Sequence, residues 1–338
     1  MKPTIINFPK SINIGNYGRI SISGIEEENF INIDGLDYIV SFLYDKENKP
    51  IKGGGNSLIL KLNSPYPDEL DDDELPAEAV IKICKNSLNS KSDYDLQRIA
   101  RFDYETKALI DLKDSSLNII KILSFGKIKI DKNINTKTGN RIIEDQYLFY
   151  VIEYATNTLS SFLTERTNLT IVDKIDLCYS LLNGLNELQI KGYYHRDIKA
   201  DNILFVNGQW KISDLGLAAN QNDDKKIDVE NEKIGPYGWL SPEVMNKVLT
   251  ENKIHIAPPF DCVIDFKSDF FQIGKLFWYI FQGNLPIGNI KEEDFRINDN
   301  ELLQIIFWLL QYNKENRPSK VEEVNGKLVA VQQKYINS

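Results

Sequence analysis

The segment 170–216 constrains the fold most, because its sequence predicts a helix, a short charged loop and a hairpin in direct succession. Thr170 and Asp173 have the spacing of a helix capping box, and Gly192 is a typical helix end. Apolar residues recur at helical spacing between them, at Cys178, Leu181, Leu182, Leu185 and Leu188. Asn207-Gly208, between two short strand-like runs, predicts a tight hairpin turn. The loop at 194–202 is therefore expected to be held at both ends.

That loop has residues suited to phosphoryl transfer. Asp197 offers a carboxylate that can accept a proton, Lys199 a fixed cation, and Asn202 an amide oxygen of the kind that Mg²⁺ prefers. The second strand of the hairpin ends at Asp214, so a second acidic group is expected to return beside the loop. The short motif alone leaves a structural alternative open, in which a hydrogen-bonded histidine lies beside a surface ion pair.

Composition narrows the class of protein. The chain has 338 residues, 42% of them hydrophobic, which is enough for one large domain or two lobes. Its net charge of −9 argues against a nucleic-acid partner and fits basic partners better. Cys84, Cys178 and Cys262 lack the spacing of a disulfide framework or a zinc site. No segment resembles a membrane span or targeting signal, so we expect a soluble protein of the reducing cytoplasm with no membrane partner.

The first part of the chain is expected to be rich in strands. Residues 1–46 alternate short β-prone runs with glycines and predict a β-rich extension that packs as a structural flap. A glycine-rich turn follows and leads into the strand-like run 58–62. Glycines allow the backbone N–H groups to approach a phosphate, and an ordinary hairpin turn is the alternative. The candidate phosphate-binding residues are Gly53, Gly54, Gly55, Asn56 and Ser57.

A charged pair is predicted next. Lys82 lies in the apolar strand-like run 79–84, where a buried ammonium group needs a partner. The pattern from 94 to 112 predicts a helix, and Glu105 shares a face with Phe102, Leu109 and Leu112. We expect Glu105 to pair with Lys82, and the alternative is a glutamate at the edge of the stripe that reaches solvent.

Further motifs follow downstream. They are Ser241-Pro242-Glu243, Asn316-Arg317-Pro318, Asp269 and Gly274. Asp269 directly precedes the segment 270–281 and Gly274 lies within it, and this segment is expected to be apolar all round and buried on every side. Taken in order with the loop at 194–202, these motifs resemble the eukaryotic-like Ser/Thr protein kinases over about residues 50–320. The resemblance implies an α+β, bilobal protein-kinase fold. A small antiparallel β-sheet lobe with one key helix would occupy 47–153, and a larger, mainly helical lobe 154–338.

The resemblance also implies an activity and a role for each residue. It implies a serine/threonine kinase that transfers the γ-phosphate of Mg-ATP to a protein hydroxyl. Lys82, held by Glu105, would bind the α and β phosphates; Asp197 would be the base and Lys199 a phosphate-steadying cation; Asn202 and Asp214 would bind Mg²⁺. Adenine would lie between Val80 and Leu204, bonded to the backbone of Glu153 and Ala155. Glu243 would pair with Arg317.

Three departures from the family pattern leave alternatives open. The glycine loop fits Gly-x-Gly-x-x-Gly in neither register, Leu215 stands in place of the usual Phe, and Pro236 stands where Ser/Thr kinases usually have Thr. A pseudokinase that acts as a binding or scaffold module is one alternative. An enzyme of the same fold with a non-protein acceptor is the other.

The activation segment has an unusual composition. It contains no Ser, Thr or Tyr between Asp214 and Tyr237, but several carboxylates, at Asp223, Asp224, Asp228, Glu230 and Glu232. We hypothesise that a carboxylate between 228 and 232 pairs with Arg196, with Arg101 as a second candidate, so that the kinase is active without loop phosphorylation. The alternative is a solvated, mobile loop.

Overall fold

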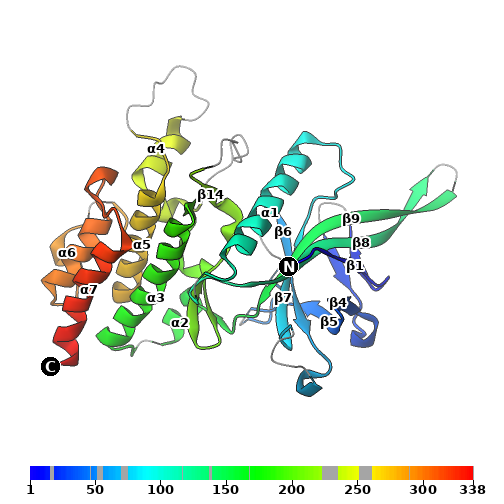
Figure 1. Cartoon of the computed structure of the whole chain (residues 1–338), viewed down its shortest axis with the longest axis horizontal. Coiled ribbons are helices and arrows are strands. Elements are labelled where there is room, and N and C mark those ends of the chain that lie inside the picture. Colours follow the sequence, from blue (N-terminus) through cyan, green and yellow to red (C-terminus); the bar gives the residue numbers. More distant parts are fainter. Residues whose placement is uncertain are drawn as a thin grey trace. The chain divides into compact units, whose positions relative to one another are not determined.

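The chain divides into two compact units, residues 1–111 with 121–154, and residues 112–120 with 155–338. The computed structural model describes residues 1–15, 19–45, 47–51, 56–69, 75–115, 117–136, 139–166, 168–222, 235–250, 261–288 and 290–337. One unit is built on a β-sheet and one key helix, and the other is mainly helical (Figure 1). The predicted bilobal α+β fold is confirmed, whereas the domain boundaries at 46 and 153 stay predictions.

The first unit is organised around a seven-stranded sheet in the order β1-β8-β9-β7-β6-β5-β4. Its strands are β1 (Thr4–Asn7), β4 (Phe30–Ile33), β5 (Leu36–Phe42), β6 (Ser57–Asn63), β7 (Glu78–Cys84), β8 (Ile122–Thr136) and β9 (Gly139–Glu153). All neighbouring pairs are antiparallel except β1 and β8, which run parallel. The β8–β9 hairpin extends beyond the other strands (Figure 1).

The N-terminal residues form part of this sheet and of its core. β1, β4 and β5 are sheet strands, and β2 (Ile12–Ile14) pairs with β3 (Ile20–Ile22) as a separate hairpin. Ile6, Ile14 and Ile33 are buried in one hydrophobic cluster with Leu60 and Ile81 of the central strands. The extension expected from the sequence therefore supplies core side chains to the first unit.

One helix of the first unit bears on the site. Helix α1 (Asp93–Leu112) buries the predicted stripe, since Phe102, Leu109 and Leu112 are each at most 3% exposed. Phe102 stacks on Tyr150 of β9 with ring centroids 5.2 Å apart, so this face of the helix packs against the sheet.

The second unit contains the remaining helices, several short strands and most of the one-turn helices (Figure 1). Its helices are α2 (Leu159–Glu165), α3 (Ile171–Ile190), α4 (Pro242–Thr250), α5 (Phe266–Gln282), α6 (Asn300–Leu309) and α7 (Val321–Ile336). Its strands are β10 (Asn157–Thr158), β11 (Tyr193–Tyr194), β12 (Ile203–Val206), β13 (Gln209–Ile212) and β14 (Ala219–Asn220). In the described residues of the chain, the 3-10 helices are η2 (Glu26–Glu28), η3 (Pro67–Glu69), η4 (Ala200–Asn202), η5 (Leu215–Leu217), η6 (Tyr237–Trp239), η7 (Glu292–Asp294) and η8 (Lys314–Asn316).

The elements on both sides of the loop at 194–202 form as predicted. The Thr170 hydroxyl accepts from Asp173 N–H at 3.1 Å while the Asp173 carboxylate accepts from Thr170 N–H at 2.9 Å, which completes the capping box of α3. Asn207 and Gly208 have φ of 47° and 78°, the positive values that a two-residue turn between β12 and β13 requires.

Helix α5 lies in the core of the second unit, and the burial predicted for residues 270–281 is confirmed for ten of these twelve residues. The expectation that it is apolar all round is wrong, because Gln272 and Lys275 are buried in it at 1% and 9% exposure. At Gly274, an added Cβ would meet the Leu309 Cβ of α6 at 2.7 Å, so α5 and α6 pack closely there. Within the described ranges, no helix is both long and apolar enough to cross a membrane.

Candidate active site

The predicted ion pair of the first unit is present. The Lys82 Nζ of β7 donates to Glu105 Oε1 of α1 at 2.7 Å, and the two residues are 9% and 3% exposed. The Tyr150 hydroxyl donates to the same Glu105 oxygen at 2.7 Å. Tyr150 lies directly opposite Lys82 in the β7–β9 pairing, which brings its ring beside the lysine. The pair is thus fixed by two strands and a helix, as a buried charge requires.

The loop of the second unit is anchored on α5. The Asp269 carboxylate accepts from the backbone N–H groups of His195 and Arg196, at 2.7 and 2.8 Å. Complete burial raises the pKa of Asp269 to about 6, although both hydrogen bonds and the charge of the Arg196 side chain oppose the rise. These contacts hold Arg196 at φ 68°, a left-handed conformation that is rare outside glycine.

Two further contacts fix the shape of the loop. The Gln272 side chain of α5 accepts from Ile198 N–H at 2.9 Å and donates to the Arg196 carbonyl at 3.0 Å. The His195 ring accepts from Asp197 N–H on Nδ1 at 3.2 Å, which places its hydrogen on Nε2, where it donates to the Ser213 carbonyl at 3.0 Å. The loop geometry is therefore set by groups far away in sequence.

The Asp197 carboxylate is held on one oxygen and lacks a partner on the other. Its Oδ2 accepts from Lys199 Nζ at 2.7 Å and from Asn202 Nδ2 at 3.0 Å. Its Oδ1 is buried, has no hydrogen-bond partner among the described residues, and faces Gly235, where an added Cβ would lie 3.2 Å away. Burial raises the pKa of Asp197 above the ordinary aspartate value, and Lys199 only partly offsets this effect. A carboxylate with spare acceptor capacity and a raised pKa suits a general base.

Asn202 and Asp214 are brought close by backbone pairing. Both the N–H and the hydroxyl of Ser213 donate to the Asn202 carbonyl, at 2.9 Å each, and Asp214 follows at φ 61°. Because Asn202 Nδ2 donates to Asp197, its Oδ1 is the atom that could bind a cation. An amide oxygen and a carboxylate fit the oxygen preference of Mg²⁺. In the part of the chain that the structure describes, no group of three or more His, Cys, Asp or Glu side chains forms a metal cluster.

The other candidate residues are divided between the two units. Ser57 begins β6, and Val80, 8% exposed, pairs with Ile152 in the β7–β9 ladder. The Glu153 N–H donates to the Lys121 carbonyl at 3.3 Å. Asn56 accepts from Lys85 N–H through its carbonyl, Ala155 follows Tyr154 as the second unit begins, and Leu204 lies in β12. Gly53, Gly54 and Gly55 lie outside the described residues, as do Asp228, Glu230 and Glu232 of the activation-segment hypothesis.

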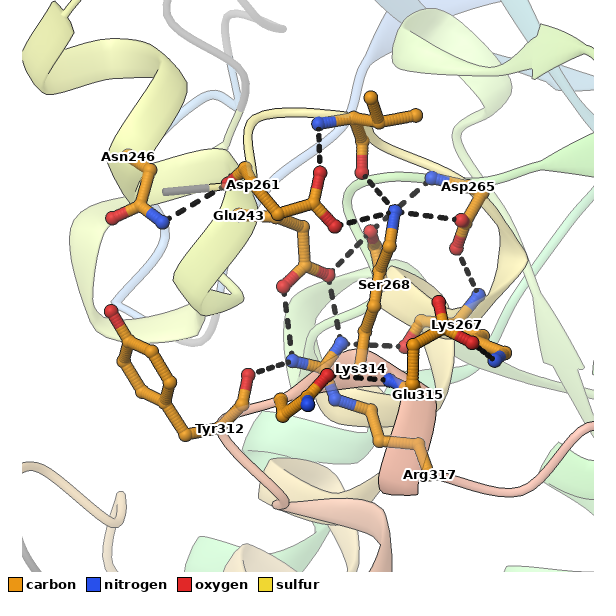
Figure 2. Close-up of polar contacts among 12 residues, drawn as sticks. Glu243, Asn246, Asp261, Asp265, Lys267, Ser268, Tyr312, Lys314, Glu315 and Arg317 are labelled. Atoms are coloured by element: carbon orange, nitrogen blue, oxygen red, sulfur yellow. Dashed lines mark hydrogen bonds and ion pairs between the residues drawn. The ribbon is translucent and has the colours of Figure 1, made fainter. Parts of the chain in front are cut away.

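The predicted Glu243–Arg317 pair forms in the second unit (Figure 2). Arg317 Nη1 and Nη2 donate to the two carboxylate oxygens of Glu243 at 2.7 and 2.9 Å, and the Ser268 hydroxyl adds a bond of 2.6 Å. Burial opposes ionisation of Glu243, but the Arg317 contacts outweigh it and hold the pKa below the ordinary value. This bidentate pair joins the start of α4 to the segment before α7.

A second charged group lies beside it in Figure 2. Lys314 Nζ is 2.9 Å from carboxylate oxygens of Asp261 and Asp265 and also donates to the Val263 carbonyl at 2.9 Å. Asp265 is the N-cap of α5. This cluster therefore fixes the start of the helix that anchors the loop.

Sequence reasoning missed Tyr150, Gln272 and Lys275. Tyr150 could have been found only from the β7–β9 register, which the sequence does not state. Gln272 and Lys275 carry a visible signal, because they follow Asp269 at intervals of three in an otherwise apolar helix.

A family model described as "Protein kinase domain" matches residues 76–334. This match covers more than half of the chain. The chain belongs to the protein kinase domain family.

Three relatives that match part of this chain have names that describe different kinds of protein. Mast/stem cell growth factor receptor Kit of Takifugu rubripes is 34% identical over 127 residues, 37% of this chain and 12% of the receptor. Serine/threonine-protein kinase ste20 of Emericella nidulans is 28% identical over 197 residues, 52% of this chain and 22% of that protein. Dual specificity protein kinase TTK of Mus musculus is 23% identical over 203 residues, 59% of this chain and 21% of that protein. The matches thus span less than a quarter of each relative.

Proposed function

We propose that this chain is an ATP-dependent protein kinase that phosphorylates serine or threonine hydroxyls. The observation that carries the proposal is the Asp197 carboxylate, which Lys199 and Asn202 hold on one oxygen while the other keeps its acceptor capacity. Membership of the protein kinase domain family supports it independently.

In the proposed reaction, Asp197 accepts the proton of the attacking hydroxyl. Lys199, 2.7 Å from Asp197 Oδ2, carries a positive charge beside the position where charge develops on the transferred phosphoryl group. Such positioning and electrostatic stabilisation supply most of the catalysis in phosphoryl transfer. His195, Asp269 and Gln272 act by holding the loop in shape.

The proposed nucleotide-binding residues are those predicted from the sequence. Lys82 would contact the α and β phosphates, with Glu105 and Tyr150 keeping its ammonium in place. Val80, Leu204 and the backbone of Glu153 and Ala155 are the proposed adenine contacts. Mg-ATP, when bound, supplies the phosphoryl group and the cation that Asn202 and Asp214 would hold.

Serine/threonine specificity is the finer part of the proposal. Lys199, two residues after Asp197, is typical of Ser/Thr-type loops, and ste20 is named a serine/threonine kinase, whereas Kit and TTK are named otherwise. Pro236 has neither a hydroxyl nor an N–H to offer Asp197, so the acceptor contacts here differ from those of kinases with threonine at this position.

The reaction is tested by transfer of labelled γ-phosphate to a basic test protein, followed by phosphoamino-acid analysis. We expect label on serine or threonine, and none with the Lys82→Met variant. Label on tyrosine alone would overturn the specificity. If wild type and Lys82→Met both bind Mg-ATP, as judged by a thermal shift, but neither transfers phosphate, the pseudokinase alternative would be favoured. Transfer only to small hydroxyl compounds would favour a non-protein acceptor.

We also propose activity without phosphorylation of the activation segment, since residues 215–236 contain no hydroxyl acceptor. Protein treated with phosphatase should keep its full activity. A variant that neutralises Asp228, Glu230 and Glu232 together should lose activity if their charge substitutes for a phosphate. Loss of activity on dephosphorylation, or full activity of the neutralised variant, would contradict this proposal.

A further inference from the structure

Lys275 is a buried lysine whose contacts differ from those of an ordinary ion pair. It lies in the middle of α5 at 9% exposure, and its Nζ donates to two backbone carbonyls, those of Gly238 at 2.9 Å and Pro286 at 3.0 Å. No ion pair of Lys275 with a carboxylate is present among the described residues. Desolvation lowers its pKa to about 8. Burying a lysine costs free energy, so we expect its ammonium group to make contacts that an apolar side chain could not make.

The two carbonyls belong to separate loops, residues 235–239 and residues 284–288, which are distant in sequence. The loops touch, because a Cβ added at Gly238 would meet Leu285 Cδ2 at 2.6 Å. Lys275 is therefore a clamp that bonds both loops to α5 at the place where they meet.

The 235–239 loop lies beside the proposed base. A Cβ added at Gly235 would lie 3.2 Å from Asp197 Oδ1, and Gly235 has φ 80°, which a residue with a side chain rarely adopts. The loop forms a single helical turn, in which Trp239 N–H donates to the Pro236 carbonyl at 2.9 Å. The position of this loop consequently shapes the approach of an acceptor to Asp197.

Lys275 also completes a pattern on α5. Asp269, Gln272 and Lys275 follow one another at intervals of three, which places them on one side of the helix. Asp269 and Gln272 bond the catalytic loop, and Lys275 bonds the 235–239 loop. One buried polar stripe thus organises both segments around Asp197.

We propose that Lys275 is a positioning residue for the acceptor, which acts by clamping the 235–239 loop to α5 and to residues 284–288. The effect on acceptor binding rests on the proposed kinase function, whereas the effect on the loop does not. Without the clamp, the loop is correctly placed for a smaller fraction of the time, and apparent acceptor affinity falls by that fraction.

Lys275→Met, which keeps the length of the side chain, separates these effects. Hydrogen exchange of the Trp239 amide, read against amides of α3, reports the loop without any need for activity. Steady-state kinetics then give KM for the acceptor and for ATP. The matched control is Lys174→Met, because Lys174 Nζ donates to the Phe281 carbonyl at the end of the same helix, at 3.4 Å.

We expect Lys275→Met to raise the hydrogen-exchange rate of the Trp239 amide and the acceptor KM about tenfold each, with KM for ATP unchanged. Lys174→Met should leave the exchange rate and both KM values unchanged. Unchanged Trp239 exchange would overturn the clamp, and faster exchange with an unchanged acceptor KM would overturn its role for the acceptor. If wild-type protein transfers no phosphate, the proposed function fails while the exchange result still decides the clamp. If Lys275→Met does not fold, Lys275→Arg, which retains donors for both carbonyls, must keep wild-type exchange and KM, or the proposal is wrong.

Discussion

Removal of Arg317 should destabilise the second unit by leaving a carboxylate buried without its partner. The Arg317 side chain is 0% exposed and that of Glu243 3%. Arg317 donates to both Glu243 oxygens and also to the carbonyls of Gln311, Lys267 and Tyr312. Arg317→Met therefore leaves Glu243 buried without its ion-pair partner and with Ser268 as its remaining side-chain donor. Breaking such a buried pair costs about 3–5 kcal/mol.

The size of this effect should depend on pH in a definite direction. In the wild type, the lowered pKa of Glu243 means that the pair stabilises the fold above the ordinary carboxylate pKa, and this contribution is lost as pH falls through the lowered value. In Arg317→Met, Arg317 no longer offsets burial, which raises the pKa of Glu243 against the remaining Ser268 hydrogen bond, so that protonation at acid pH relieves the cost. The difference in free energy of unfolding should thus be largest near neutral pH and shrink as the solution is acidified.

Tryptophan fluorescence during urea unfolding suits this measurement, because all four tryptophans, Trp210, Trp239, Trp278 and Trp308, belong to the second unit. Lys334→Met is the control, since it breaks an exposed pair with Glu301 in the same unit and should change stability by about 0–1 kcal/mol. A double variant, Glu243→Met with Arg317→Met, should be less destabilised than Arg317→Met alone. Equal stability of Arg317→Met and wild type, or no recovery in the double variant, would refute the reasoning.

Two further predictions use the same unit. Gly274→Ala should lower the free energy of unfolding by about 1–3 kcal/mol, because the added methyl group would overpack against Leu309. The control is Gly326→Ala, at an open position of α7, which should raise the free energy of unfolding by about 0.5–1 kcal/mol. A stabilising effect of Gly274→Ala would contradict the packing of α5 on α6. The raised pKa of Asp197 predicts that kcat/KM falls on acidification at a pH above the ordinary aspartate pKa of 3.8, because the base takes up a proton. A raised pKa favours the folded state at low pH, so the loss of activity should precede any loss of structure detected by fluorescence. A fall in kcat/KM only at or below the ordinary aspartate pKa would contradict this prediction.

The sequence predicted features whose signals are local or periodic. Lys82 stands out as a charge in an apolar strand and Glu105 as a charge on an apolar helix face, so their pairing follows from burial. The Asn207-Gly208 turn follows from the backbone conformation that it needs. The same kind of local signal predicted that Asp197, Asn202 and Asp214 lie in one region.

Features that depend on register or on distant loops could not be predicted in this way. Tyr150 reaches Glu105 because β9 pairs with β7 in one particular register, which no local pattern fixes. Lys275 meets Gly238 and Pro286, whose positions depend on the packing of two loops. The joining of β1 to β8 in parallel likewise required contacts far apart in the chain.

The central claim is that Asp197 is the base of phosphoryl transfer to a protein. Its most direct test is single-turnover transfer of labelled γ-phosphate by Asp197→Asn at saturating Mg-ATP, with the thermal shift by Mg-ATP confirming that nucleotide binding is retained. We predict a loss of roughly 10²–10⁴-fold in the transfer rate, the range for removal of a general base, with binding unchanged. Transfer at the wild-type rate by Asp197→Asn would contradict the claim.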